Sequence, residues 1–321
     1  MNKRDLLLRA EGAALKAIDP LNSERKLRLL GPLSEGFMRL WPLKTLHCKK
    51  TSIPRADGSR LRLCILNGKK PGGKTVGVLW LHGGGYAVAT PEMAVLTFAG
   101  RLVKHENCVI VSPDYTLSVK KPYPAALEDC YNALEYMADH AEELGIRRDQ
   151  LIVGGESAGG GLAAAVCLYA RDQGRIPVAF QIPLYPMLDC FDTPSSRDNH
   201  GRNWNTRRNH WGWKHYLGDL YGSPSVPKYA SPSRETDYTG LPPAYTYVLD
   251  GEPFLDETRT YIRNLQEAGV DAAVDVYHGD FHGFDVFFWT RNAKTAKRKL
   301  CEHYAARFAA PPQTPGEPAP R

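Results

Sequence analysis

One stretch near the middle of the chain has the residue types and spacing of a nucleophilic site. It reads Gly155-Glu-Ser-Ala-Gly159, and the hydroxyl of Ser157 is the group that could attack a substrate. The branched apolar residues 151–153 predict a buried strand before it, and the alanine-rich residues 162–170 predict a helix after it. A serine in such a sharp strand-to-helix turn presents its hydroxyl openly, and a glycine two residues away on each side avoids a collision.

Two other interpretations of this stretch are weaker. A glycine-rich turn with an incidental serine fits the motif alone, but not the strand and helix around it. The segment Gly159-Gly-Gly161-Leu-Ala-Ala164 loosely fits a dinucleotide fingerprint, which needs its first glycine directly after the strand and an acid about twenty residues later. Here the fingerprint would begin inside the helix, and Asp172 comes only 13 residues after Gly159. The sequence therefore disfavours a nucleotide site.

A second glycine-rich stretch, His82-Gly-Gly-Gly85, directly follows a predicted buried strand at 75–81. Three successive glycines let backbone N–H groups face one point without side chains in the way, which suits an oxyanion hole. Alone, the stretch fits a flexible loop equally well, but the nucleophile downstream favours the oxyanion hole. The helix after Ser157 also directs its free N–H groups and positive dipole end toward that residue.

A serine nucleophile needs a base, and His282 is the best candidate. It is followed by Gly283 and lies just past the last predicted strand, where a parallel sheet places its active site. His278 is the second choice. A metal site formed by His278, Asp280 and His282 is a further alternative, but the sequence has no remote ligand cluster to complete it. Neither a metal nor a cofactor is predicted.

Composition limits the remaining function classes. The chain has 321 residues, is 43% hydrophobic and 24% charged, and carries a net charge of +6. These values are ordinary for a globular protein with one large domain or two. Basic residues occur in pairs and form no long run, so we expect no nucleic acid partner. No stretch approaches the apolar length of a membrane span.

The cysteines and the N-terminal residues predict a cytoplasmic protein. The seven cysteines are scattered and odd in number, and no C-x-x-C pair occurs, which is typical of a reducing compartment. Three lie in apolar surroundings and are predicted to be small core residues: Cys64, Cys108 and Cys167. The apolar run at 6–8 ends at Arg9, so no signal peptide is predicted.

Strands and helices alternate along most of the chain, which predicts a mostly parallel sheet with helices on both faces. The predicted strands are 44–53, 60–66, 75–81, 108–112, 151–153, 178–184, 243–249 and 271–277; the predicted helices include 125–144, 162–170, one ending at 268 and one ending near 309. Residues 1–45 have two amphipathic helical patterns. They fit either a lid or simple packing on the core.

The aromatic, polar segment 189–222 interrupts the alternation. It is interpreted as a substrate-covering cap insertion, with a surface subdomain built on its own aromatic core as the alternative. The core then comprises 46–188 and 223–310, and the proline-rich tail 311–321 is predicted to be disordered.

Six motifs, in order, together resemble the bacterial hormone-sensitive-lipase family of esterases. Besides the two glycine-rich stretches they are Tyr123-Pro-Ala-Ala-Leu-Glu-Asp129, Tyr229-Ala-Ser-Pro232, Gly240-Leu-Pro-Pro243 and His282-Gly-Phe284. The resemblance covers roughly residues 75–290. It implies an α/β-hydrolase fold with a helical cap, and ester hydrolysis through an acyl-enzyme without a cofactor. It implies Ser157 as nucleophile and His282 as base. It also implies that the oxyanion is bound by the N–H groups of three residues: Gly83, Gly84 and Ala158.

The sequence departs from the family pattern in three places. The elbow has Glu156 where the family mostly has Asp, which we interpret as harmless. The segment Thr116-Leu-Ser-Val-Lys-Lys121 replaces the family's Arg-Leu-Ala-Pro-Glu stretch, and the local loop packing is therefore not predicted. The family's Asp-Pro-Leu-x-Asp motif reads Glu252-Pro-Phe-Leu-Asp256.

Three carboxylates follow the strand at 243–249, and Glu252 is the predicted triad acid. Asp250 is next to the strand end, which would restrict its side chain. Asp256 follows Pro253, which suits the first helical position, so its carboxylate is placed in the first turn of a helix. Glu252 lies at the tip of the loop and matches the family's acid.

The predicted function is hydrolysis of short-chain acyl esters by a serine carboxylesterase. The alternatives are a catalytically silent ligand-binding protein on the same fold, and a peptidase or lipase of the same superfamily. The predicted partner is a small ester, and association with further copies of the chain is left open.

Overall fold

The computed structural model describes residues 36, 48–67, 75–106 and 108–308. Apart from residue 36, the predicted helical segment 1–45 lies outside the described residues, as does the predicted tail 311–321. No described helix is long and apolar enough to cross a membrane.

A single eight-stranded sheet forms the centre of the described chain, in the order β1-β2-β4-β3-β5-β6-β7-β8. The strands are β1 Cys48–Pro54, β2 Arg60–Asn67, β3 Thr75–Leu81, β4 Cys108–Pro113, β5 Ile146–Glu156, β6 Phe180–Leu184, β7 Ala244–Leu249 and β8 Ala272–Tyr277. β2 pairs antiparallel with both of its neighbours, and the other pairs are parallel. Strands β4, β6 and β7 are buried along their whole length, as expected for parallel strands covered on both faces. The predicted mostly parallel α/β architecture is confirmed.

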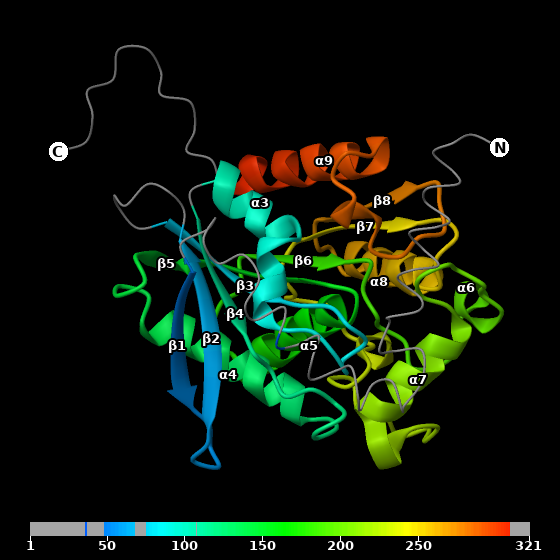
Figure 1. Ribbon diagram of the computed structural model, residues 1–321, viewed down its shortest axis with the longest axis horizontal. Helices are drawn as coiled ribbons and strands as arrows, with labels where there is room; N and C mark the ends of the chain where they lie inside the picture. Colours follow the sequence, from blue (N-terminus) through cyan, green and yellow to red (C-terminus); the bar gives the residue numbers. More distant parts are fainter. Residues whose placement is uncertain (1–35, 37–47, 68–74, 107, 309–321) are drawn as a thin grey trace.

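Helices cover both faces of this sheet (Figure 1). One apolar core lies beneath α4 Ala125–Asp139, α5 Ala158–Gln173 and α8 Leu255–Glu267; the other lies beneath α3 Phe98–His105 and α9 Arg291–Phe308. The remaining described helices are α6 Pro194–Arg197, α7 Thr206–Leu217, η2 Pro91–Val95, η3 Gly218–Leu220, η4 Pro232–Arg234 and η5 Phe284–Val286. α4 ends five residues earlier than predicted. There the chain turns back, with Gly145 at φ +66° and the N–H of Ile146 donating to the carbonyl of Ala141.

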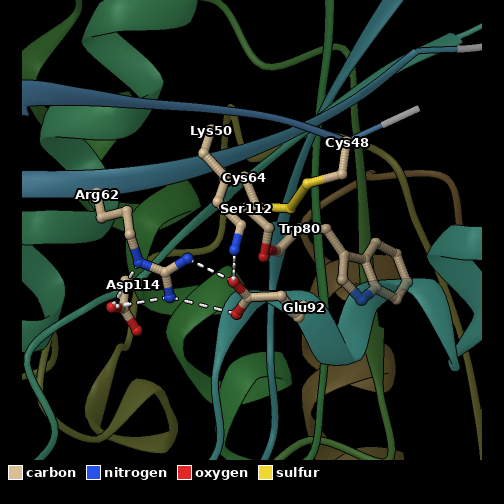
Figure 2. Close-up of a disulfide and its surroundings, with 8 residues drawn as sticks. All are labelled: Cys48, Lys50, Arg62, Cys64, Trp80, Glu92, Ser112 and Asp114. Atoms are coloured by element: carbon tan, nitrogen blue, oxygen red, sulfur yellow. Dashed lines mark hydrogen bonds and ion pairs between the residues drawn. A yellow bond between two sulfur atoms is a disulfide. The ribbon is translucent and has the colours of Figure 1, made fainter. Parts of the chain in front are cut away.

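The edge ribbon of β1 and β2 contains a disulfide and is joined to the rest of the sheet domain by ion pairs (Figure 2). Cys48 and Cys64 form a disulfide across the ribbon. Cys64 is buried in the core, as predicted, but the sequence analysis did not predict its pairing. The strand register places Cys64 opposite Lys50, two residues from Cys48, within reach of a diagonal bridge. Arg62 on β2 bonds the carboxylate of Glu92 on η2 and, at 3.0 Å, that of Asp114 after β4.

The insertion at 189–222 packs onto the sheet domain through its aromatic side chains. Trp204, Trp213 and Tyr216 are buried. The ring of Tyr216 stacks on Tyr86, which lies in the loop after β3, with a centroid distance of 3.9 Å. The ring of Trp213 lies 5.6 Å from the ring of Tyr86 between centroids. These aromatics therefore share a core with the loop that follows β3, which disfavours a self-contained subdomain.

Candidate active site

The turn at Ser157 joins β5 to α5 in a backbone conformation that side chains rarely adopt. Ser157 has φ +58° and ψ −119°, and such a non-glycine residue persists only where its surroundings enforce it. A Cβ atom built on Gly155 would lie 2.4 Å from the carbonyl oxygen of Leu81, and one on Gly159 would lie 2.1 Å from that oxygen. Both glycines are therefore needed because β3 passes close to the turn.

The glycines that loosely fit a dinucleotide fingerprint are also explained by close packing. Gly159, Gly160 and Gly161 lie inside α5. A Cβ atom on Gly161 would lie 2.1 Å from the carbonyl oxygen of Met187. Close packing of the helix accounts for these glycines without any nucleotide.

Three side chains from separate elements form a continuous chain of hydrogen bonds. The hydroxyl of Ser157 lies 2.8 Å from Nε2 of His282, and Nδ1 of His282 bonds Oε2 of Glu252. All three residues are buried, and Glu252 has no exposed surface. An ionised carboxylate only accepts hydrogen bonds, so Nδ1 is the donor to Glu252 and Nε2 is left to accept the serine proton.

The three carboxylates near β7 have distinct partners. The second oxygen of Glu252 accepts the N–H of Leu249 at 2.7 Å, which orients the carboxylate toward His282. Asp250 accepts the N–H of Gly279 at 2.9 Å and pairs with exposed His278; the bond from Gly279 lowers the pKa of Asp250, and His278 adds to the effect. Asp256 accepts the N–H of Ser195 in α6 at 2.7 Å. The geometry places Glu252 alone of the three against the imidazole of His282.

The alternative metal cluster is not assembled. His278 pairs with Asp250, Asp280 pairs with Arg202, and His282 bonds Ser157 and Glu252. Within the described ranges, no group of three or more His, Cys, Asp or Glu side chains is arranged to hold a metal ion.

The predicted oxyanion residues surround the serine turn. A Cβ atom built on Gly83 would lie 3.4 Å from Cβ of Ser157, and Ala158 is the first residue of α5. Gly84 has φ +109°, and a Cβ atom there would lie 2.2 Å from the carbonyl oxygen of Val88. Gly83 and Ala158 thus adjoin the serine, and Gly84 makes the turn that directs the loop past it.

His82 supports this loop, a role that the sequence reasoning did not assign. Its Nδ1 donates to the carbonyl of Gly83 at 2.8 Å, its ring stacks on Tyr115 at 4.1 Å, and the Tyr115 hydroxyl donates to the His82 carbonyl at 2.8 Å. Burial lowers the pKa of His82 to about 4, so the ring is neutral at pH 7.

A second group of buried polar residues, which the sequence did not predict either, lies against His282. The carboxyl of Asp285 accepts the hydroxyls of Tyr185 at 2.7 Å and Tyr247 at 2.8 Å. The ring of Tyr185 meets His282 edge-on, with the centroids 5.0 Å apart. These residues come from distant parts of the chain, so no local spacing could have identified them.

Glu156, which precedes the serine, belongs to the same region. Its carboxyl accepts the indole N–H of Trp80 at 3.1 Å. Burial, together with the nearby carboxyl of Asp285, raises the pKa of Glu156 to about 8. Glu156 is therefore mostly protonated at pH 7.

Comparison with known proteins places this geometry in context. A family model described as the alpha/beta hydrolase fold matches residues 78–286. Carboxylic ester hydrolase LipN of Mycobacterium tuberculosis is 35% identical over 224 residues, 66% of this chain and 58% of LipN. Esterase LipI of the same organism is 32% identical over 218 residues, 64% of this chain and 65% of LipI. The match thus spans less than two thirds of either relative.

A solved structure gives a fuller match. A bacterial heroin esterase superposes with a TM-score of 0.82 and 31% identity, covering 93% of this chain and 96% of that one.

The raised pKa of Glu156 predicts a pH-dependent contribution to stability. Because the pKa in the folded protein, about 8, exceeds the ordinary value of 4.5, the folded state holds this proton more tightly than the unfolded state. The stabilisation is complete below about pH 4.5 and is lost as the pH rises through about 8. Glu156→Gln has no proton to lose, so we expect it to gain thermal stability relative to the wild type between pH 5 and pH 9. Melting temperatures across this range test the prediction.

The matched control is Glu142→Gln, which changes an exposed carboxylate. It should melt in parallel with the wild type at every pH. A constant offset between Glu156→Gln and the wild type would show that Glu156 is ionised throughout.

Proposed function

Because the chain belongs to the hormone-sensitive-lipase family of the α/β-hydrolase fold, we propose that it is a serine carboxylic ester hydrolase. The observation that carries this proposal is the hydrogen-bond chain from Ser157 through His282 to Glu252. A nucleophile, a base and an orienting acid in this order are the parts that acyl transfer requires. The esterase names of the relatives support the same reaction class.

In the proposed mechanism, Ser157 attacks the ester carbonyl carbon while Nε2 of His282 accepts the serine proton. The carbonyl oxygen becomes an oxyanion, stabilised by the N–H groups of Gly83, Gly84 and Ala158. As the C–O bond breaks, His282 returns the proton to the leaving alcohol and an acyl-serine remains. Water then attacks the acyl carbon while Nε2 of His282 accepts its proton. The bond between the acyl carbon and Oγ of Ser157 breaks, His282 returns the proton to Ser157, and the carboxylic acid leaves. Glu252 holds the Nδ1–H tautomer and stabilises the imidazolium.

A ligand-binding protein that has lost catalysis is the alternative from another class. The base and the acid are both present and bonded in order, which favours the enzyme. No described feature favours a peptidase or a lipase over an esterase.

The substrate class, the assembly and the cellular location of the protein are also proposed. We infer a small ester as substrate, with association into homo-oligomers left open. Location in the cytoplasm remains a prediction: five cysteines carry free thiols, whereas the Cys48–Cys64 disulfide is a bond that a reducing compartment disfavours.

Ser157→Ala should abolish ester hydrolysis and leave the fold intact, because alanine cannot form the acyl-enzyme. Removing the nucleophile of such a unit lowers kcat by about 10⁶-fold in a comparable enzyme. Hydrolysis of a chromogenic acetyl ester and a melting curve measure both parts. A variant that retains a large share of the wild-type rate would exclude Ser157 as the nucleophile.

Substitution of the three carboxylates should separate their roles. Glu252→Gln should lower kcat by about 10⁴-fold, because the amide favours the wrong imidazole tautomer. Asp250→Asn should change kcat little, since Asp250 bonds Gly279 and His278 instead. Asp256→Asn should act mainly on stability, through its bond to Ser195. Values of kcat and melting temperature for each variant decide which carboxylate is the triad acid. If Glu252→Gln is near normal, the role belongs to the residue whose variant is inactive.

The enzyme should hydrolyse short acyl esters faster than long ones. Trp204 of the insertion packs so closely on the loop after β3 that a Cβ atom on Gly85 would lie 2.4 Å from its ring, and Trp204 also lies 6.2 Å from His282 between ring centroids. This bulk limits the space beside the serine. A p-nitrophenyl ester series from acetyl to palmitoyl measures the trend, and a clear preference for long, emulsified esters would contradict it.

A further inference from the structure

The segment Ser195–Trp204 of the insertion contacts both loops that carry the acid and the base. Toward the acid loop, the hydroxyl of Ser195 donates to the carbonyl of Pro253 at 2.8 Å, and its N–H donates to Asp256 at 2.7 Å. The side-chain amide of Asn199 donates to the carbonyl of Gly251, next to Glu252, at 3.1 Å. The residues on both sides of Glu252 are thus tied to the insertion.

Toward the base loop, the contact falls on the histidine itself. The side-chain amide of Asn203 donates to the backbone carbonyl of His282 at 2.9 Å. The neighbouring residue Arg202 pairs with Asp280 at 2.6 Å, with both side chains about half exposed. The ring of Trp204 lies 6.2 Å from the His282 ring between centroids. Three consecutive residues of the insertion therefore contact the base loop.

The backbone of the base loop needs such a restraint. Gly279 has φ +154° and Gly283 has φ +76°, and glycine gives the chain unusual conformational freedom at both positions. The imidazole must keep two bonds at once, to Ser157 and to Glu252. A rotation of the peptide at residue 282 would lengthen both, and misplacement of a catalytic group by about 1 Å can lower a rate 10²-fold.

We propose that Asn203 is a positioning residue for catalysis, which holds the backbone of His282 so that the imidazole stays in line between Ser157 and Glu252. Asn203 touches no reacting atom, and acts only through the carbonyl of His282. This inference rests on the proposed function. It assigns to the insertion a part in aligning the base, in addition to any covering of substrate.

The test uses Asn203→Ala and the nearly isosteric Asn203→Asp, which keeps the side-chain volume but has no N–H to donate. We expect kcat for a short ester to fall about tenfold to a hundredfold while KM stays nearly unchanged, because only the alignment of the base is lost. A proton in a strong hydrogen bond between an imidazole and a carboxylate gives a far-downfield ¹H NMR signal, so we expect one from the bond between His282 and Glu252. That signal should broaden or move upfield in both variants.

The matched control is Asn132→Ala. The amide of Asn132 on α4 donates to the carbonyl of Pro54 at 2.9 Å, so the control removes the same kind of bond far from the triad. It should leave kcat and the downfield signal unchanged. Asn203 variants that fold and keep both the wild-type kcat and the wild-type signal would overturn the proposal.

If the protein is not an esterase, the experiment gives a different result from the one expected if Asn203 has no positioning role. A wild-type protein that hydrolyses no ester would refute the esterase assignment, but the NMR signal would still report whether Asn203 positions His282. An unchanged signal in both folded variants would then overturn the positioning role independently of turnover.

Discussion

The site depends on one backbone constraint, the strained positive-φ conformation of Ser157 between a buried strand and a helix. Such a conformation costs about 1–3 kcal/mol and must be imposed by the surroundings. Three backbone hydrogen bonds impose it: the N–H of Ser157 donates to Leu184, and the carbonyl of Ser157 accepts the N–H groups of Gly161 and Met187, all at 3.0 Å. The strained turn is thus held by β6 and by the loop that follows it.

The same constraint sets what can surround the serine. Because β3 and α5 approach the turn so closely that only glycine fits at 155 and 159, the loop after β3 passes directly beside Ser157. The aromatic rings of the insertion then pack on that loop through Tyr86. The turn between β5 and α5, the glycine loop after β3 and the insertion form one packed unit, in which the hydroxyl of Ser157 has a defined place.

Two buried glutamates near this turn have different contacts. Glu252 accepts a backbone N–H and bonds the imidazole of His282, the contacts that an ionised carboxylate requires when it is removed from water. Glu156 bonds the indole of Trp80 and lies near the carboxyl of Asp285, and burial raises its pKa to about 8. The first is suited to orient a base, and the second is mostly neutral at pH 7. The departure from the family's usual Asp at position 156 is thus accommodated inside the core.

The sequence by itself determined those features that depend on local chemistry. Apolar branched runs identified the buried strands, and glycine spacing identified the serine turn, because both signals lie within a few consecutive residues. The prediction of Glu252 over its two neighbours came from local position and from the resemblance to the family motif. In the structure, Glu252 bonds Nδ1 of His282. The tertiary structure decided what depends on strand register and on packing between distant segments. It brought Cys48 to Cys64, assembled Asp285 with two tyrosines and placed Asn203 against His282, since hydrogen bonds and packing between residues far apart leave no periodic trace along the chain.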